Sequence, residues 1–155
     1  MIKNLASFIY HLLGWKAEGE VPSDIKKYII LAAPHTSNWD FFYGRLFFLM
    51  KGIPLKFFIK QEWFFFPFNY IFKALGGVPV NRAKNQNLTD EISAVFNRYE
   101  ELAIMIPPEG TRSYNPDWKK GFYYISQKAN VPIILGYIDF ENKICGLGPF
   151  FHITE

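Results

Sequence analysis

The sequence predicts an α/β fold: a single domain with a central, mostly parallel or mixed sheet that is flanked by helices. Short apolar runs of strand length alternate along the chain with segments of helical periodicity, which is the pattern of a layered α/β fold. The length of 155 residues suits one domain, and half of the residues are apolar while a fifth are charged. We therefore expect residues 1–155 to form one domain, with an amphipathic N-terminal helix over residues 1–15 and the core over residues 28–150.

The N-terminal third predicts a helix, a buried strand and a second helix. Apolar residues recur at helical spacing across residues 2–14. Residues 28–33 form a continuous apolar run, which is typical of a strand that is buried on both faces. A helix is expected over residues 37–51, because Ser37 and Asp40 have the Ser-x-x-Asp spacing of a capping box.

The middle third contains prolines and glycines that interrupt its elements. Residues 55–59 are a strand candidate, and residues 63–75 are expected to be helical in part, with a break at Pro67. A short extended piece is expected at residues 78–80. Apolar positions then recur across residues 88–102, which predicts an amphipathic helix.

The C-terminal third returns to short strands. Residues 103–106 predict another buried strand, and residues 107–117 predict a loop because they are rich in Pro, Gly and Asn. A helix is expected over residues 119–129 and a strand over residues 131–138. An Asn-Lys pair then suits a hairpin turn into residues 144–147.

Charge and cysteine content narrow the classes of partner. The net charge of +3 is a mild basic bias, too weak to indicate nucleic-acid binding but suited to an anionic lipid or a phosphorylated substrate. Cys145 is the single cysteine, which excludes an internal disulfide and favours a reducing compartment. We expect a buried thiol there and no nucleophile. No apolar run approaches the ~20 residues that span a bilayer, so a soluble or peripheral protein is expected.

The histidine at the end of the first buried strand is the first candidate for chemistry. His35 lies between that strand and a helix, at the kind of strand end where α/β folds bind ligands. If Ser37 is the N-cap, Asp40 faces back toward the loop that holds His35. A carboxylate on one ring nitrogen fixes the histidine tautomer and leaves the other nitrogen as a base, worth ~10²–10⁴-fold in rate. In the alternative interpretation, Asp40 only caps the helix and His35 is an ordinary loop histidine.

Other residues argue against metal and serine chemistry. His11 and His152 have no metal-ligand spacing with His35, so no metal is expected. Ser113 and Ser126 lie outside any Gly-x-Ser-x-Gly elbow, which argues against a serine hydrolase.

Three further segments accompany the histidine segment. Residues 77–82 place Arg82 after a short strand, residues 108–113 read Pro-Glu-Gly-Thr-Arg-Ser, and residues 131–134 open the last long strand. With the His35-x₄-Asp40 pair, in this order and at these separations, they resemble the four blocks of the glycerolipid acyltransferase family. That family includes the 1-acylglycerol-3-phosphate (lysophosphatidate) acyltransferases, and the resemblance covers roughly residues 28–150.

The resemblance implies a glycerol-3-phosphate acyltransferase-like fold and an O-acyltransferase. Such an enzyme moves an acyl chain from acyl-CoA or acyl-carrier protein to a lysolipid hydroxyl, here 1-acylglycerol-3-phosphate, which would give phosphatidate. His35 would act as the base and Asp40 would orient it, without an acyl-enzyme, a metal or a cofactor. The acceptor's phosphate would meet Arg82, with a surface ion pair as the alternative for that residue.

The resemblance also implies roles for the Glu-Gly-Thr-Arg block. Arg112 is a second cation for the acceptor, and Glu109 either bonds the acceptor or braces the loop. Gly110 would serve backbone shape, and Thr111 would bond phosphate or Glu109 or be structural.

Departures from the family pattern keep the acceptor open. Pro34 replaces the usual Asn, Pro107 stands where an aromatic residue is usual, and Trp39 is larger than the residue that is frequent before the aspartate. An amino-acid lipid or another lysolipid is the close alternative acceptor. A non-catalytic lipid-binding protein and a thioesterase are alternatives of a different class.

Aromatic residues make up 19% of the chain and crowd residues 57–72, with lysines on either side. Rings together with lysines favour a membrane interface, and rings can also line an acyl groove. We call residues 57–72 the aromatic band and expect it to make a peripheral membrane contact, at the inner face of the cytoplasmic membrane. The alternative is an aromatic core with an oligomer interface.

Overall fold

A computed structural model describes residues 2–80 and 88–153 of the chain. Within these residues one sheet has seven strands in the order β1-β7-β6-β2-β5-β3-β4, and every neighbouring pair is parallel except the antiparallel pair β6–β7. The predicted α/β fold with a mixed sheet is therefore confirmed. The strands are β1 (Lys16–Glu18), β2 (Lys27–Ala32), β3 (Leu55–Lys60), β4 (Gly77–Val80), β5 (Leu102–Ile106), β6 (Ile133–Asp139) and β7 (Ile144–Phe151).

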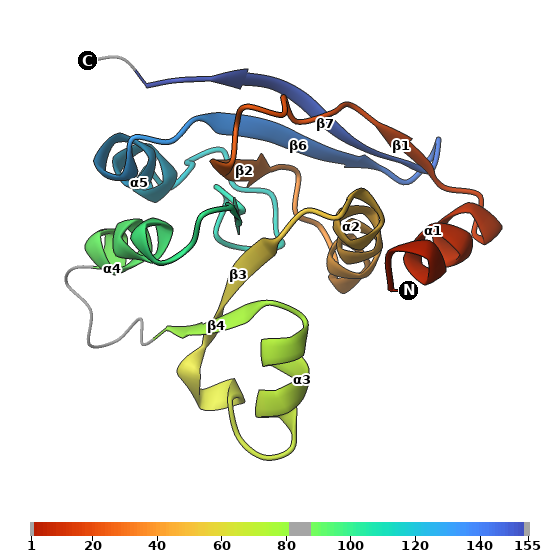
Figure 1. Ribbon diagram of the computed structural model, residues 1–155, viewed down its shortest axis with the longest axis horizontal. Coiled ribbons are helices and arrows are strands. Elements are labelled where there is room, and N and C mark those ends of the chain that lie inside the picture. Colours follow the sequence, from red (N-terminus) through yellow and green to blue (C-terminus); the bar gives the residue numbers. More distant parts are fainter. Residues whose placement is uncertain (1, 81–87, 154–155) are drawn as a thin grey trace.

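Helices cover both faces of the sheet (Figure 1). On one face α1 packs against α2, and on the other α4 packs against α5. The side chains of Ile29 and Ile30 are both fully buried but belong to different core clusters, because successive residues of β2 point to opposite faces. The helices are α1 (Ile2–Leu12), α2 (Asn38–Lys51), α3 (Phe68–Ala74), α4 (Leu88–Val95) and α5 (Gly121–Ala129), with short 3-10 turns η1 (Gln61–Trp63) and η2 (Phe96–Arg98).

The expected helix over residues 88–102 is too long. Helix α4 ends at Val95, the turn η2 follows, and Tyr99 is already extended at φ −130° and ψ 147°. The chain has to extend there because β5 pairs with β2 from Leu102 onward. No Gly or Pro marks this boundary, so the sequence lacked a stop signal.

The sheet edges also differ from expectation. Strand β1 was missed because its three residues contain no apolar run, and its pairing with β7 is what defines it. Strand β7 continues beyond the expected residue 147 to Phe151, because it pairs with β6 along its length. Helix α5 begins at Gly121 and not at Lys119, since the backbone N–H of Lys119 donates to the carbonyl of Pro108 at 2.9 Å.

Parallel pairing brings two loops to one edge of the sheet. Strands β2 and β5 are neighbours, with Leu31 opposite Ile106, so both end at the same edge. The loop that follows β2 carries His35, and the loop that follows β5 carries Glu109. The topology therefore positions the histidine block beside the Glu-Gly-Thr-Arg block.

Candidate active site

The start of α2 holds Asp40 in a capping box. Ser37 is the N-cap in extended conformation, and its Oγ accepts the backbone N–H of Trp39 at 3.1 Å. The Oδ2 atom of Asp40 accepts the backbone N–H groups of Thr36 at 2.6 Å and Ser37 at 2.9 Å. These bonds confirm the predicted helix start and fix the carboxylate toward the loop before the helix.

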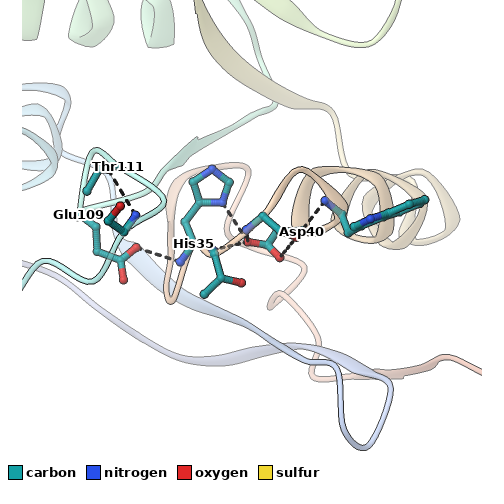
Figure 2. Close-up of polar contacts among 8 residues, drawn as sticks. His35, Asp40, Glu109 and Thr111 are labelled. Carbon is teal, nitrogen blue, oxygen red and sulfur yellow. Dashed lines mark hydrogen bonds and ion pairs between the residues drawn. The ribbon is translucent and has the colours of Figure 1, made fainter.

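The same carboxylate oxygen contacts the ring of His35. Nδ1 of His35 lies 3.0 Å from Oδ2 of Asp40, and Figure 2 shows the ring directed at the carboxylate. The Asp40 side chain is 9% exposed and the His35 side chain 27%. A carboxylate on Nδ1 leaves Nε2 as the nitrogen that can take a proton from a substrate. The structure thus brings together the two residues that the sequence paired.

A second carboxylate reaches His35 from the loop after β5. Oε2 of Glu109 accepts the backbone N–H of His35 at 2.9 Å, across 74 positions of sequence. Glu109 is only 8% exposed, and its carbonyl accepts a hydrogen bond from Nδ2 of Asn115 at 3.1 Å. Of the two roles that the sequence left open for Glu109, the contact that the structure shows is a loop brace.

The rest of the Glu-Gly-Thr-Arg block is more exposed. Gly110 has a φ of +65°, which L side chains rarely adopt, and a Cβ there would come within 3 Å of the Lys119 side chain. Oγ1 of Thr111 accepts the backbone N–H of Ser113 at 3.3 Å, and Arg112 is exposed. Arg82, the other proposed phosphate residue, lies outside the described residues.

A cavity of about 830 Å³ opens beside the His35–Asp40 pair. Its polar lining includes Thr111, Arg112 and Lys119. Its apolar lining comes from several elements and includes rings of α2, β3 and α3, for example Phe41, Phe57, Phe58 and Phe72. A base at the wall of a cavity that is apolar on one part and cationic on another can deprotonate the hydroxyl of an amphiphile that carries a negative charge.

Sequence reasoning missed three residues in this region. Lys119 was placed in a helix, although it lines the cavity from the loop. Tyr137 also lines the cavity, and its hydroxyl donates to Oε2 of Glu18 at 2.7 Å, which raises the pKa of the tyrosine. Its position after the apolar run 131–136, near the end of β6, was a usable signal.

Arg45 is the third missed residue, and nothing in the sequence pointed to it. It lies on α2, and its Nε and Nη1 atoms are buried without a hydrogen-bond partner in the described part of the chain. Burial lowers the pKa of this guanidinium. A buried donor without a partner lowers the stability of a fold, so Arg45 is expected to destabilise this one.

Cys145 is buried, as expected, and lines the cavity. Burial raises the pKa of its thiol to about 11, which keeps it protonated near neutral pH and unsuited to act as a nucleophile. Over residues 2–80 and 88–153, no group of three His, Cys, Asp or Glu side chains is arranged to hold a metal ion.

The aromatic band divides into an inner and an outer set of rings. Phe57, Phe58 and Phe72 line the cavity. The outer set projects with η1 and α3 away from the rest of the fold (Figure 1), and neither element has a buried residue. The exposed members are Trp63, Phe65, Phe66, Phe68 and Tyr70. None of the described helices has both the length and the apolar character needed to cross a membrane.

Comparison with known proteins identifies the family. The family model named Acyltransferase matches residues 16–137. No curated protein matches the sequence. Among solved structures, the fold is similar to the 1-acyl-sn-glycerophosphate (LPA) acyltransferase PlsC from Thermotoga maritima, with a TM-score of 0.66 and 22% identity over 97% of this chain and 67% of that chain. Because the family match covers well over half of the residues, the chain belongs to the acyltransferase family and is an acyltransferase enzyme.

Proposed function

We propose that this enzyme transfers an acyl chain from acyl-CoA or acyl-carrier protein to the free hydroxyl of 1-acylglycerol-3-phosphate, which gives phosphatidate. The observation that carries the proposal is the 3.0 Å contact of His35 with Asp40 at the wall of a cavity with apolar and cationic parts. The apolar part suits an acyl chain, and the cations suit the acceptor's phosphate. The similar PlsC fold, that of an LPA acyltransferase, is in keeping with this acceptor.

The chemistry requires one base and no acyl-enzyme. Nε2 of His35 takes the proton from the acceptor hydroxyl as the oxygen attacks the thioester carbonyl carbon. The tetrahedral intermediate collapses, the carbon–sulfur bond breaks, and the thiolate leaves and takes the proton back from His35. Asp40 holds Nδ1–H and stabilises the imidazolium while that proton is in transit.

Arg112 and Arg82 are the proposed phosphate ligands. Arg112 lines the cavity and is exposed, so its guanidinium can reach an incoming headgroup. Arg82 belongs to the proposal through its place in the sequence block. Lys119 lines the same part of the cavity and adds positive charge there.

The proposal is tested by mass spectrometry of the lipids that the purified enzyme forms. Lysophosphatidate, a neutral monoacylglycerol and a hydroxylated amino-acid lipid are supplied together, with palmitoyl-CoA and palmitoyl-carrier protein in separate reactions. Phosphatidate is the expected product, and His35→Ala lowers its rate by at least ~10²-fold. A dominant product from another acceptor contradicts the acceptor assignment, and thiol release without any acceptor indicates a thioesterase.

The phosphate contact has its own test. Arg82→Ala and Arg112→Ala are each expected to lose more activity on lysophosphatidate than on the neutral acceptor, because a bidentate phosphate contact is lost only on the former. Equal losses on both acceptors contradict the assignment of that arginine. His35→Ala is the comparison variant, since it loses activity on both.

We also propose that the aromatic band makes a peripheral contact with the inner face of the cytoplasmic membrane. Large rings are exposed together on η1, α3 and the segment between them, for example Phe66 at 80% and Tyr70 at 66%. The exposed lysines Lys60 and Lys73 stand at either side of them and suit anionic headgroups. Inner rings of the same band line the cavity, which gives a short path from the bilayer to His35 for a lipid acceptor.

A further inference from the structure

His35 is held by two carboxylates at two different places. Asp40 contacts the ring at Nδ1, and Glu109 accepts the backbone N–H at 2.9 Å, so that His35 lies between them (Figure 2). A hydrogen bond from a neutral donor to a carboxylate is shorter and stronger than one between neutral groups. With Glu109 only 8% exposed, solvent competes little for that bond.

Glu109 is itself fixed within its loop. Its carbonyl accepts a hydrogen bond from Asn115, and the adjacent Pro108 carbonyl accepts the backbone N–H of Lys119 at 2.9 Å. The loop begins at the end of β5, directly beside the end of β2 that leads to His35. The carboxylate therefore ties one loop to the other across the edge of the sheet.

We propose that Glu109 is a positioning residue that fixes the backbone of His35 relative to the loop carrying Thr111 and Arg112. Asp40 orients the ring, and Glu109 sets the place from which that ring projects. The inference rests on the proposed function, because it takes His35 as the base. One oxygen of Glu109 is occupied by the His35 N–H, and we assign the acceptor contacts to the exposed Thr111 and Arg112.

Steady-state kinetics of Glu109→Ala and Glu109→Gln separate positioning from acceptor binding. The Gln amide oxygen can still accept the His35 N–H, so Glu109→Gln is expected to keep kcat within about 3-fold. Glu109→Ala leaves that N–H without a partner and is expected to lower kcat about 10–100-fold, with the KM for the acceptor within about 2-fold of wild type. A rise in acceptor KM at unchanged kcat, in either variant, overturns the inference. Glu100→Ala is the matched control, since Glu100 is exposed and precedes β5, at the opposite end of that strand from the loop that holds Glu109.

A spectroscopic readout applies whatever the acceptor is. The chain has three histidines, so selective ¹⁵N labelling resolves the backbone amide of His35. In wild type and Glu109→Gln this amide is expected to exchange slowly with solvent, and in Glu109→Ala its proton should shift upfield and exchange at least about tenfold faster. An unchanged His35 amide in Glu109→Ala overturns the positioning role.

The two proposals fail in different ways. Full activity in His35→Ala refutes the proposed function, whichever way the Glu109 variants behave. An inactive His35→Ala together with Glu109 variants that change only the acceptor KM refutes the positioning role alone. Thermal unfolding shows whether the Glu109→Ala protein folds. If it does not, Glu109→Gln decides. A lower kcat or a fast-exchanging His35 amide in Glu109→Gln overturns the inference, whereas wild-type values of both support it.

Discussion

The corner between β2 and α2 and the excursion between β3 and β4 hold their side chains in different ways. At the corner, the polar groups bond to one another within a few residues, as in the contacts of Asp40 with Thr36, Ser37 and His35. In the excursion, the rings contact mainly each other, with centroids 5.2 Å apart for Phe65 and Phe68, and no residue of η1 or α3 is buried.

The two regions differ in whether the fold itself provides partners for their side chains. Hydrogen bonds at the corner satisfy their donors and acceptors inside the fold, so the His35–Asp40 pair is preorganised before any ligand binds. The apolar surface of the excursion is not covered by any described part of the chain. Apolar surface is stabilising only when another surface removes it from water. The geometry of the His35–Asp40 pair is thus internal to the fold, while the proposed membrane contact depends on a second phase.

The largest expected effect comes from separating the two roles of Asp40. In Asp40→Asn, the amide oxygen can still accept the N–H groups of Thr36 and Ser37, but it no longer stabilises an imidazolium at His35. We expect kcat to fall about 10²–10⁴-fold while the thermal midpoint changes little. Ser37→Ala is the matched control, because it removes the cap, costs about 1 kcal/mol of stability and leaves the His35–Asp40 contact in place.

Two outcomes for Asp40→Asn and Ser37→Ala would contradict this interpretation of the corner. A fully active Asp40→Asn protein would return Asp40 to a purely structural capping role. A Ser37→Ala protein as inactive as Asp40→Asn would show that the cap and the base pair act as one unit.

The second effect concerns the excursion. Replacing Trp63, Phe65 and Phe66 by Ala is expected to weaken binding to vesicles that contain anionic lipid about 10–100-fold, because exposed rings leave the interface. Turnover of a substrate presented in detergent should stay within about 3-fold of wild type, since these residues are absent from the cavity lining. Sedimentation with vesicles measures the first quantity and thiol release the second.

The control for the band is an exposed ring pair elsewhere. Tyr123 and Tyr124 are exposed on α5, and their replacement by Ala should leave vesicle binding unchanged. Equal loss of vesicle binding in both sets of variants would mean that exposed rings bind vesicles wherever they lie on the surface, which contradicts a specific role of the aromatic band.

The same contrast explains which features could be predicted from the sequence. The capping box at Ser37 is a local motif, so the corner and the start of α2 were predicted correctly. Strand β1 and the end of β7 depend on pairing between distant segments and have no local apolar pattern. The contact of Glu109 with His35 spans 74 positions, so the sequence could name both residues but not choose between the roles open to Glu109.

A third effect concerns stability at Arg45. It follows Phe41 by one helical turn, and the centroid of the Phe41 ring lies 4.7 Å from that of Phe57 in β3. Arg45→Met removes buried donors without partners, and we expect it to raise the free energy of unfolding by about 1–3 kcal/mol. Urea denaturation measures the change, with the exposed Arg98→Met as control. A loss of stability would show that Arg45 has a partner in solution.

The smallest effect tests a polar pair at the outer edge of the sheet. The hydroxyl of Tyr137 crosses Gly146 of β7 to reach Glu18 of β1, and a Cβ at Gly146 would come within 2.1 Å of the ring. The bond to Glu18 raises the pKa of Tyr137, so its stabilisation is fully present below the ordinary tyrosine pKa and is lost as pH rises through the raised value. Glu18→Gln should lower that pKa and flatten the alkaline loss of stability slightly, since the pair is exposed. Absorbance titration of the tyrosines measures the pKa, with Tyr137→Phe identifying its contribution. If the tyrosine titration of Glu18→Gln is the same as that of wild type, the hydrogen bond between Tyr137 and Glu18 is absent in solution.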